Sequence, residues 1–108
     1  MLSLVVLISG GGSNLLALLE ASENALFPAR VVAVGADREA DGLEHAERFG
    51  VPSFSVALTN FADREGWGDA LLEQIQEWDP DLVILSGFMR LLPPHVVAAL
   101  SPRLLNTH

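Results

Sequence analysis

The fold class of this chain is decided by residues 2–14, which read LSLVVLISGGGSN. Residues 2–8 form an almost uninterrupted apolar run, which is typical of a strand buried on both faces of a parallel sheet. A glycine turn follows at residues 9–14, and leucines then recur at helical spacing from Leu15, with Ser13 or Asn14 as the expected N-cap. A buried strand, a glycine turn and a helix in this order predict an α/β fold.

The rest of the chain repeats this alternation of buried strands and helices. Strands that alternate with helices at this spacing predict a Rossmann-like parallel sheet with helices on both faces and right-handed crossovers. We expect one domain over residues 1–108, truncated at its C-terminal end because no helix covers the last strand. The expected helices span residues 42–49, 62–78 and 95–100, and the further strands span residues 30–36, 52–56, 81–86 and 103–106.

Composition narrows the classes of function. The chain has 108 residues, with 14 acidic and 6 basic side chains and a formal charge of −8. Such an acidic chain lacks the basic surface that binds nucleic acid. Charged residues interrupt every apolar stretch that could span a bilayer. It has no cysteine, and its three scattered histidines lack metal-ligand spacing. We therefore expect a cytoplasmic protein whose ligand is small, with no nucleic acid, membrane or metal involved.

The glycine turn is interpreted as a phosphate-binding loop. Glycines let the backbone approach a ligand closely, and a helix N-terminus offers unpaired N–H groups with a partial positive charge. The turn has no Walker lysine, and no third glycine follows Gly10 and Gly12 at the spacing of dinucleotide-binding loops. A tight turn whose glycines serve only the backbone geometry is the structural alternative.

Two further segments follow strands and so lie at the same edge of the predicted sheet. In the strand end Asn106-Thr107-His108, Asn106 and His108 share one side, where an amide and an imidazole suit oxyanion stabilisation and proton transfer. Residues 87–92, which read GFMRLL, suit the lining of a slot for a flat, partly apolar ligand. For each segment taken alone, a structural role is the more common case: a hydrogen-bonded strand end, or an apolar cover on the sheet.

Three more polar residues are weaker candidates. Asp37 ends the second strand, where a ribose-binding acid would lie in a dinucleotide domain, and a solvated turn fits its acidic neighbours equally well. We interpret His45 as a solvated surface residue and His95 as a residue at the start of the last helix.

Three stretches in register resemble glycinamide ribonucleotide formyltransferase. They are residues 5–15 (VVLISGGGSNL), 85–92 (LSGFMRLL) and 104–108 (LLNTH). Their order, intervals and placement at strand ends match that family over all 108 residues. Because the family's chain is nearly twice as long, this chain looks like its N-terminal half. The resemblance implies formyl transfer from 10-formyltetrahydrofolate to the amine of 5-phosphoribosylglycinamide, a step of purine biosynthesis.

The resemblance also implies roles for individual residues. Asn106 and a protonated His108 would be catalytic, since both would donate to the oxyanion that forms when the amine attacks the formyl carbon. The phosphate of the substrate would be held by Gly12, Ser13 and Asn14. The formyl donor would contact Arg64, Met89, Arg90, Leu91, Leu92 and Asn106.

The family's catalytic aspartate and part of its folate-binding loop would lie downstream of residue 108, so we expect this chain alone to be inactive. For the full-length protein, the sequence does not decide between a monomer and a homodimer. Within the enzyme class, the alternatives are formyltetrahydrofolate deformylase and methionyl-tRNA formyltransferase. The serine- and glycine-rich turn disfavours both, and the negative charge also disfavours tRNA. Outside the enzyme class, the alternative is a non-catalytic Rossmann-like nucleotide-binding module, which would bind NAD.

Overall fold

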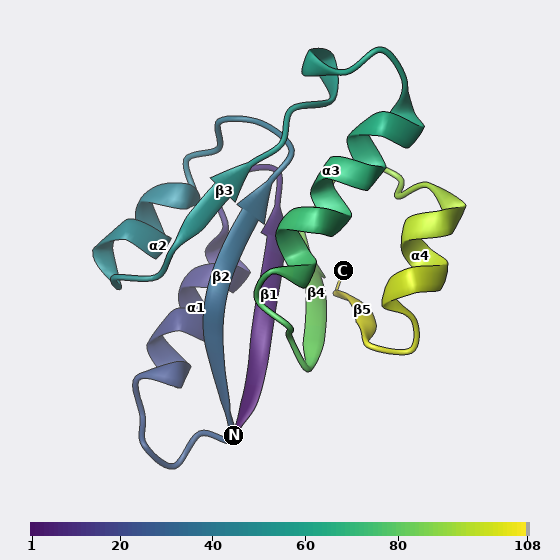
Figure 1. The fold of residues 1–108 in the computed structure, drawn as a ribbon. Coiled ribbons are helices and arrows are strands. Elements are labelled where there is room, and N and C mark those ends of the chain that lie inside the picture. Colours follow the sequence, from purple (N-terminus) through teal and green to yellow (C-terminus); the bar gives the residue numbers. More distant parts are fainter. Residues whose placement is uncertain (108) are drawn as a thin grey trace.

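A computed structural model describes residues 1–107 as a single five-stranded parallel sheet with helices on both faces. The strands are β1 (Leu2–Ile8), β2 (Ala29–Ala36), β3 (Ser53–Ser55), β4 (Leu82–Ser86) and β5 (Leu104–Thr107). The helices are α1 (Ser13–Ser22), α2 (Leu43–Arg48), α3 (Arg64–Gln76) and α4 (Pro94–Leu100). The strand order is β3-β2-β1-β4-β5, with α1 and α2 on one face and α3 and α4 on the other (Figure 1). The predicted Rossmann-like architecture is confirmed.

β1 lies in the centre of the sheet and is buried on both faces, as its apolar sequence predicts. Val5, Val6, Leu7 and Ile8 each have 0% exposure. Successive side chains of a strand point to opposite faces. Val6 and Ile8 therefore join the core beneath α1 and α2, whereas Val5 and Leu7 join the core beneath α3 and α4. Both helical layers are thus anchored on one strand.

The bounds of the elements differ from the predictions mainly at helix ends. The N-cap of α1 is Gly12, not Ser13 or Asn14. α3 begins later than predicted because the Asp63 carboxylate caps it, with the Gly66 N–H donating to Asp63 Oδ1 at 2.7 Å. A short 3₁₀ helix, η1 (Leu58–Asn60), was not predicted. In the part of the chain that the structure describes, no helix has the length and apolar character needed to cross a membrane.

The register of the sheet brings the carboxyl ends of the strands to one edge, here called the carboxyl rim. Leu7 of β1 pairs with Leu85 of β4, which in turn pairs with Asn106 of β5. The connection from β1 to β2 carries α1 on one face, while that from β3 to β4 carries α3 on the other (Figure 1). The winding of the sheet therefore reverses between β1 and β4. In open α/β sheets, ligands bind outside the carboxyl ends of the strands at this point.

Candidate functional site

The glycine turn opens α1 without a side-chain cap. Gly12 occupies the N-cap position with a left-handed backbone, φ 69° and ψ 41°. The N–H groups of Ser13, Asn14 and Leu15 have no acceptor within the helix, and no other hydrogen bond occupies them in residues 1–107. The side chains of Ser13 and Asn14 are exposed. The turn thus presents free backbone donors and a helix N-terminus at the rim, which is what a small anion requires.

The glycines of the turn differ in what the fold demands of them. Gly12 has a positive φ that side-chain-bearing residues rarely adopt. Gly10 and Gly11 have no positive φ, and a Cβ atom at either position would meet nothing within 4 Å. Backbone geometry therefore accounts for Gly12 but not for its two neighbours. The open space over Gly10 and Gly11 is what a ligand that contacts the backbone would occupy.

A hollow of about 120 Å³ lies between the glycine turn and the end of β4. Residues 10–14 line it, together with Ser86 and Gly87. The hollow therefore sits between the carboxyl ends of β1 and β4, where the winding of the sheet reverses. Its volume suits a group such as a phosphate and is well below the roughly 300 Å³ or more of pockets that enclose whole small molecules.

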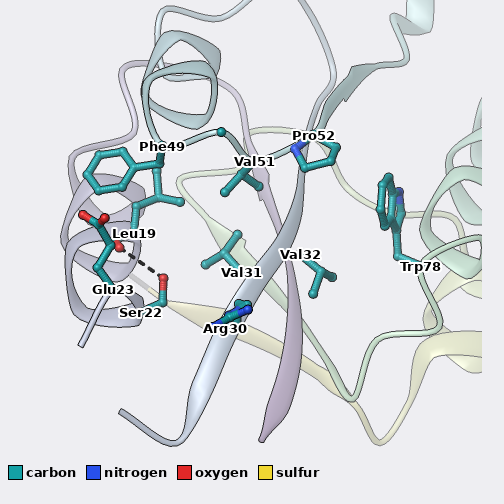
Figure 2. A pocket seen from close by; sticks show the side chains of 11 residues that line it. Leu19, Ser22, Glu23, Arg30, Val31, Val32, Phe49, Val51, Pro52 and Trp78 are labelled. Atoms are coloured by element: carbon teal, nitrogen blue, oxygen red, sulfur yellow. Dashed lines mark hydrogen bonds between the residues drawn. The ribbon is translucent and has the colours of Figure 1, made fainter. Parts of the chain in front are cut away.

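A larger hollow of about 700 Å³ lies away from the carboxyl rim (Figure 2). It runs beside the first half of β2, between the end of α1, the segment before β3, and Trp78. The Ser22 hydroxyl in its lining already donates to the Leu19 carbonyl at 3.1 Å. Glu23 and Arg30 are the charged residues of the lining. A binding site directs several polar groups toward one ligand, and the smaller hollow does so with the free N–H groups of the glycine turn. The smaller hollow is therefore the better candidate.

Residues 87–92, hereafter loop 87–92, divide between core and surface. Phe88 and Leu92 pack against the core beneath α3 and α4, and the Phe88 ring stacks on Trp67 with the ring centroids 6.3 Å apart. Met89 and Leu91 are 76% and 81% exposed. The interpretation of this segment as an apolar cover for the sheet therefore holds for Phe88 and Leu92, whereas Met89 and Leu91 are free to meet a ligand.

Asp37 ties loop 87–92 to the ends of two strands. Its side chain is fully buried, and its Oδ2 atom accepts from Arg90 Nε at 3.0 Å and from Arg38 Nη2 at 2.9 Å. The Ser9 hydroxyl helps to lower the pKa of this carboxyl, and Ser9 Oγ accepts from the Met89 N–H at 2.7 Å. Loop 87–92 is therefore joined to Asp37 through the Arg90 side chain, and to the end of β1 through the Met89 amide.

These bonds set the charge state of Asp37. Burial alone would raise the pKa of the carboxyl, but hydrogen bonds from Arg38, Ser9 and Arg90 outweigh it and hold that pKa below its ordinary value. The prediction of a solvated turn at Asp37 is wrong, because the side chain is buried. The ribose-binding alternative is also disfavoured, since Arg38 Nε occupies Oδ1 at 3.2 Å and two arginines occupy Oδ2.

Arg64 lies close to loop 87–92 although it comes much earlier in the sequence. It is the first residue of α3, and its Nη1 atom donates to the Leu91 carbonyl at 2.7 Å. Asn106 is exposed on β5 and pairs in register with Leu85 of β4. The structure thus places the residues predicted to contact a formyl donor on one stretch of the rim. The other predicted catalytic residue, His108, lies outside the described residues.

The remaining histidines are not part of this site. His95 Nε2 lies 2.7 Å from Asp69 Oδ1, and His95 stands in the first turn of α4 as predicted. His45 is half-buried, and its Nδ1 atom is closed off from solvent without a hydrogen-bond partner among residues 1–107. The prediction that His45 is a solvated surface residue is therefore wrong. No group of three or more metal-ligating side chains occurs in the described range.

Sequence reasoning missed Ser9 and Arg38 and the pairing of Asp37 with Arg90. One signal was available, because Ser9 and Asp37 each follow a predicted strand directly and so had to lie at the carboxyl rim. The partner of Asp37 was not available from the sequence, since Arg90 lies 53 positions away.

Comparison with known proteins identifies the family. Residues 2–108 match the protein-family model described as formyl transferase. The chain belongs to the formyl transferase family. The resemblance seen in the sequence is thereby confirmed.

Two similar proteins within the formyl transferase family are named phosphoribosylglycinamide formyltransferase. The chain is 46% identical to the phosphoribosylglycinamide formyltransferase of Mycobacterium tuberculosis, over 97% of this chain and 48% of the relative. It is 39% identical to the enzyme of the same name from Escherichia coli K12, over 99% of this chain and 51% of the relative. This chain therefore spans about half the length of the curated relatives that it matches.

Solved formyl transferase structures share the fold described above. Phosphoribosylglycinamide formyltransferase from Brucella melitensis superposes with a TM-score of 0.95 at 41% identity, covering 99% of this chain and 56% of that chain. Glycinamide ribonucleotide transformylase 1 from Symbiobacterium toebii gives a TM-score of 0.92 at 39% identity, covering 98% of this chain and 50% of that chain.

Proposed function

We propose that residues 1–108 form the N-terminal, ribotide-binding half of an enzyme that transfers a formyl group from 10-formyltetrahydrofolate to 5-phosphoribosylglycinamide in purine biosynthesis. The observation that carries the proposal is the hollow at the rim, with its free backbone donors, in a chain whose relatives are named for this reaction. The proposal includes a cytoplasmic location and needs no metal.

In this proposal, Gly12, Ser13 and Asn14 hold the phosphate of the ribotide. Their side chains and backbone carry no positive charge, so the attraction comes from oriented N–H groups and the N-terminal end of α1. This arrangement suits a protein with a formal charge of −8, which would repel a polyanion but can hold one phosphate locally.

The formyl donor occupies the neighbouring stretch of the rim and contacts Arg64, Met89, Arg90, Leu91, Leu92 and Asn106. Support for this assignment comes from the high exposure of Met89 and Leu91 on a loop whose other apolar residues are packed. The Arg90 side chain is held by Asp37, so the loop offers the donor chiefly backbone groups and apolar surface. Such a surface suits a flat heterocycle with a hydrogen-bonding edge.

The reaction needs a donor at the formyl oxygen. The amine nitrogen of the ribotide forms a bond to the formyl carbon, and the electron pair of the C=O bond moves onto oxygen. Asn106 and His108 donate hydrogen bonds to this oxyanion. The C=O bond then re-forms, the bond between carbon and the donor nitrogen breaks, and the proton lost by the amine is taken up by the departing nitrogen.

The proposal is tested by calorimetric titration of the chain with phosphoribosylglycinamide. In Gly12→Ala, the left-handed backbone that directs the N–H groups toward the phosphate is strained. Loss of one hydrogen bond to a charged group costs about 1.5–3 kcal/mol, so binding should weaken by about tenfold or more. Gly50→Ala is the matched control. Gly50 shares the φ of 69° and stands at the end of α2, away from the rim, with nothing within 4 Å of an added Cβ. Both variants carry a left-handed alanine, but only Gly12 lines the hollow.

Two results would contradict the proposal. Equal ribotide affinities for Gly12→Ala and Gly50→Ala would remove the glycine turn from the site. Binding of NAD in place of the ribotide would favour the nucleotide-binding module. Formyl transfer by this chain without a complementing fragment would refute only the narrower expectation that it is inactive alone.

A further inference from the structure

Asp37 is a buried carboxylate that the proposed reaction does not use. It follows β2 directly, so it stands on the carboxyl rim, with the end of β1 between it and the end of β4, which leads into loop 87–92. Its side chain has 0% exposure, whereas its partners Arg38 and Arg90 have 46% and 34%. A buried charge is costly unless it is paired and hydrogen-bonded, so this site has been built around the carboxylate.

Two independent routes lead from Asp37 to loop 87–92. The first is direct, from Asp37 Oδ2 to Arg90 Nε at 3.0 Å. The second is less direct: the Ser9 hydroxyl, which helps to lower the pKa of Asp37, accepts the Met89 N–H at 2.7 Å. Adjacent residues of the loop, Met89 and Arg90, are therefore fixed to one point, one by its backbone and the other by its side chain.

Residues 10–14 of the glycine turn have supports apart from the Asp37 side chain. The Gly10 carbonyl accepts the Gly42 N–H at 3.0 Å. The course of the turn into α1 is set by the backbone of Gly12. Loss of the Asp37 charge should therefore release loop 87–92 while the phosphate-binding turn keeps its own supports.

We propose that Asp37 is a positioning residue that holds loop 87–92 in the conformation that receives the formyl donor. The identity of the ligand as a folate rests on the proposed function, whereas the positioning of the loop does not. Because the Arg90 side chain is engaged with a carboxylate, Asp37 also decides what the loop offers a ligand: backbone groups and apolar surface, and not a free guanidinium.

The experiment uses the ¹⁵N-labelled chain and its Asp37→Asn variant, which keeps the shape and removes the charge. The solvent exchange rate of the Met89 amide, measured by NMR, should rise by about tenfold or more, as expected when a hydrogen bond within a charged network is lost. Affinity for the folate probe 5-formyltetrahydrofolate should fall by about tenfold, while affinity for inorganic phosphate at the glycine turn should change by less than about twofold. A general loss of stability would not separate the two affinities.

Further variants show which contact holds loop 87–92. Arg38→Gln removes another partner of Asp37 without touching loop 87–92 and should leave Met89 exchange and folate affinity near the wild-type values. Ser9→Ala should speed Met89 exchange while the bond between Asp37 and Arg90 remains. If Asp37→Asn fails to fold, Ser9→Ala and Arg90→Gln, each of which cuts one route, carry the test.

The outcomes are distinguishable. Unchanged Met89 exchange in Asp37→Asn and Ser9→Ala would overturn the proposal, as would a parallel fall in phosphate and folate affinity. If Met89 exchange responds as expected but the wild-type chain binds no folate probe, the positioning role stands and the assignment of the formyl donor fails.

Discussion

The glycine turn and loop 87–92 share the carboxyl rim but are held in different ways. The turn is shaped by its own backbone, with Gly12 at φ 69° and Gly10 bonded to the backbone of Gly42. Loop 87–92 is shaped by side chains that come from other elements, chiefly Asp37 after β2 and Arg64 at the start of α3.

This difference has a physical consequence. A turn held by its own dihedral angles stays ordered as long as the flanking strand and helix are intact. A loop held by side chains from other elements opens more readily when one of those partners is removed, even if the fold survives. The turn should therefore fail through changes to its own backbone or to the backbone of Gly42 that packs against it, and the loop through side chains that come from other elements.

The largest expected effect on stability comes from a tryptophan that packs against loop 87–92. Trp67 is fully buried, donates its Nε1–H to the Val56 carbonyl at 2.7 Å and stacks on Phe88. Trp67→Ala should lower the free energy of unfolding by about 3–5 kcal/mol, measured by urea denaturation. Trp78→Ala, at a tryptophan that is 36% exposed, is the control and should cost less than half as much. Equal losses for the two variants would contradict the importance assigned to Trp67.

The next largest expected effect comes from Gly42, whose backbone packs against the glycine turn. A Cβ atom at Gly42 would lie 2.8 Å from the Gly10 carbonyl oxygen and 2.6 Å from Ile8 Cδ1. Gly42→Ala should destabilise the chain by about 1–3 kcal/mol through overpacking, and should also weaken phosphate binding because the turn must shift. Gly11→Ala, with open space and no positive φ, should leave the free energy of unfolding unchanged within about 0.5 kcal/mol. Equal destabilisation of both variants in urea would show that the turn is not held by this close approach.

The acid sensitivity of the chain should depend on Asp37. The pKa of this carboxyl is lower in the folded chain than its ordinary value of 3.8. Its contribution to stability is therefore present above about pH 4 and is lost as the pH falls through the lower folded value. In urea denaturation measured from pH 6 down through the folded pKa of Asp37, the wild type should lose stability more steeply than Asp37→Asn. The difference in free energy of unfolding between the two should therefore narrow as the pH falls.

Two other carboxylates serve as references for this measurement. Hydrogen bonds from the Ser3 backbone and hydroxyl also lower the pKa of Asp81, and that contribution is common to wild type and Asp37→Asn. Glu39→Gln, at an exposed carboxylate near Asp37, should keep the wild-type slope. A constant gap between wild type and Asp37→Asn at every pH would contradict the role of the charge.

The two loops also mark how far the sequence could predict the structure. The strand at residues 2–8 and the glycine turn were predictable because apolar runs and glycines act locally. The N-cap was wrongly predicted, since Gly12 adopts the left-handed conformation and leaves the Ser13 and Asn14 side chains exposed. The engagement of Asp37 with Arg90 was not predictable, because it depends on strand order and register. The site was recognisable as three stretches, but the bonds that join them were not.

The smallest expected effect concerns the outer support of the loop. Arg64 is exposed, so Arg64→Gln should change the free energy of unfolding by less than about 0.5 kcal/mol. Its bond to the Leu91 carbonyl nevertheless ties the loop to the start of α3. Chymotryptic cleavage after Leu91 should therefore quicken severalfold in Arg64→Gln, whereas Arg48→Gln, at an exposed arginine of α2, should leave the rate unchanged. If cleavage does not quicken, Asp37 and Ser9 alone suffice to hold the loop, and the contrast with the glycine turn then rests on the buried network and not on the surface arginine.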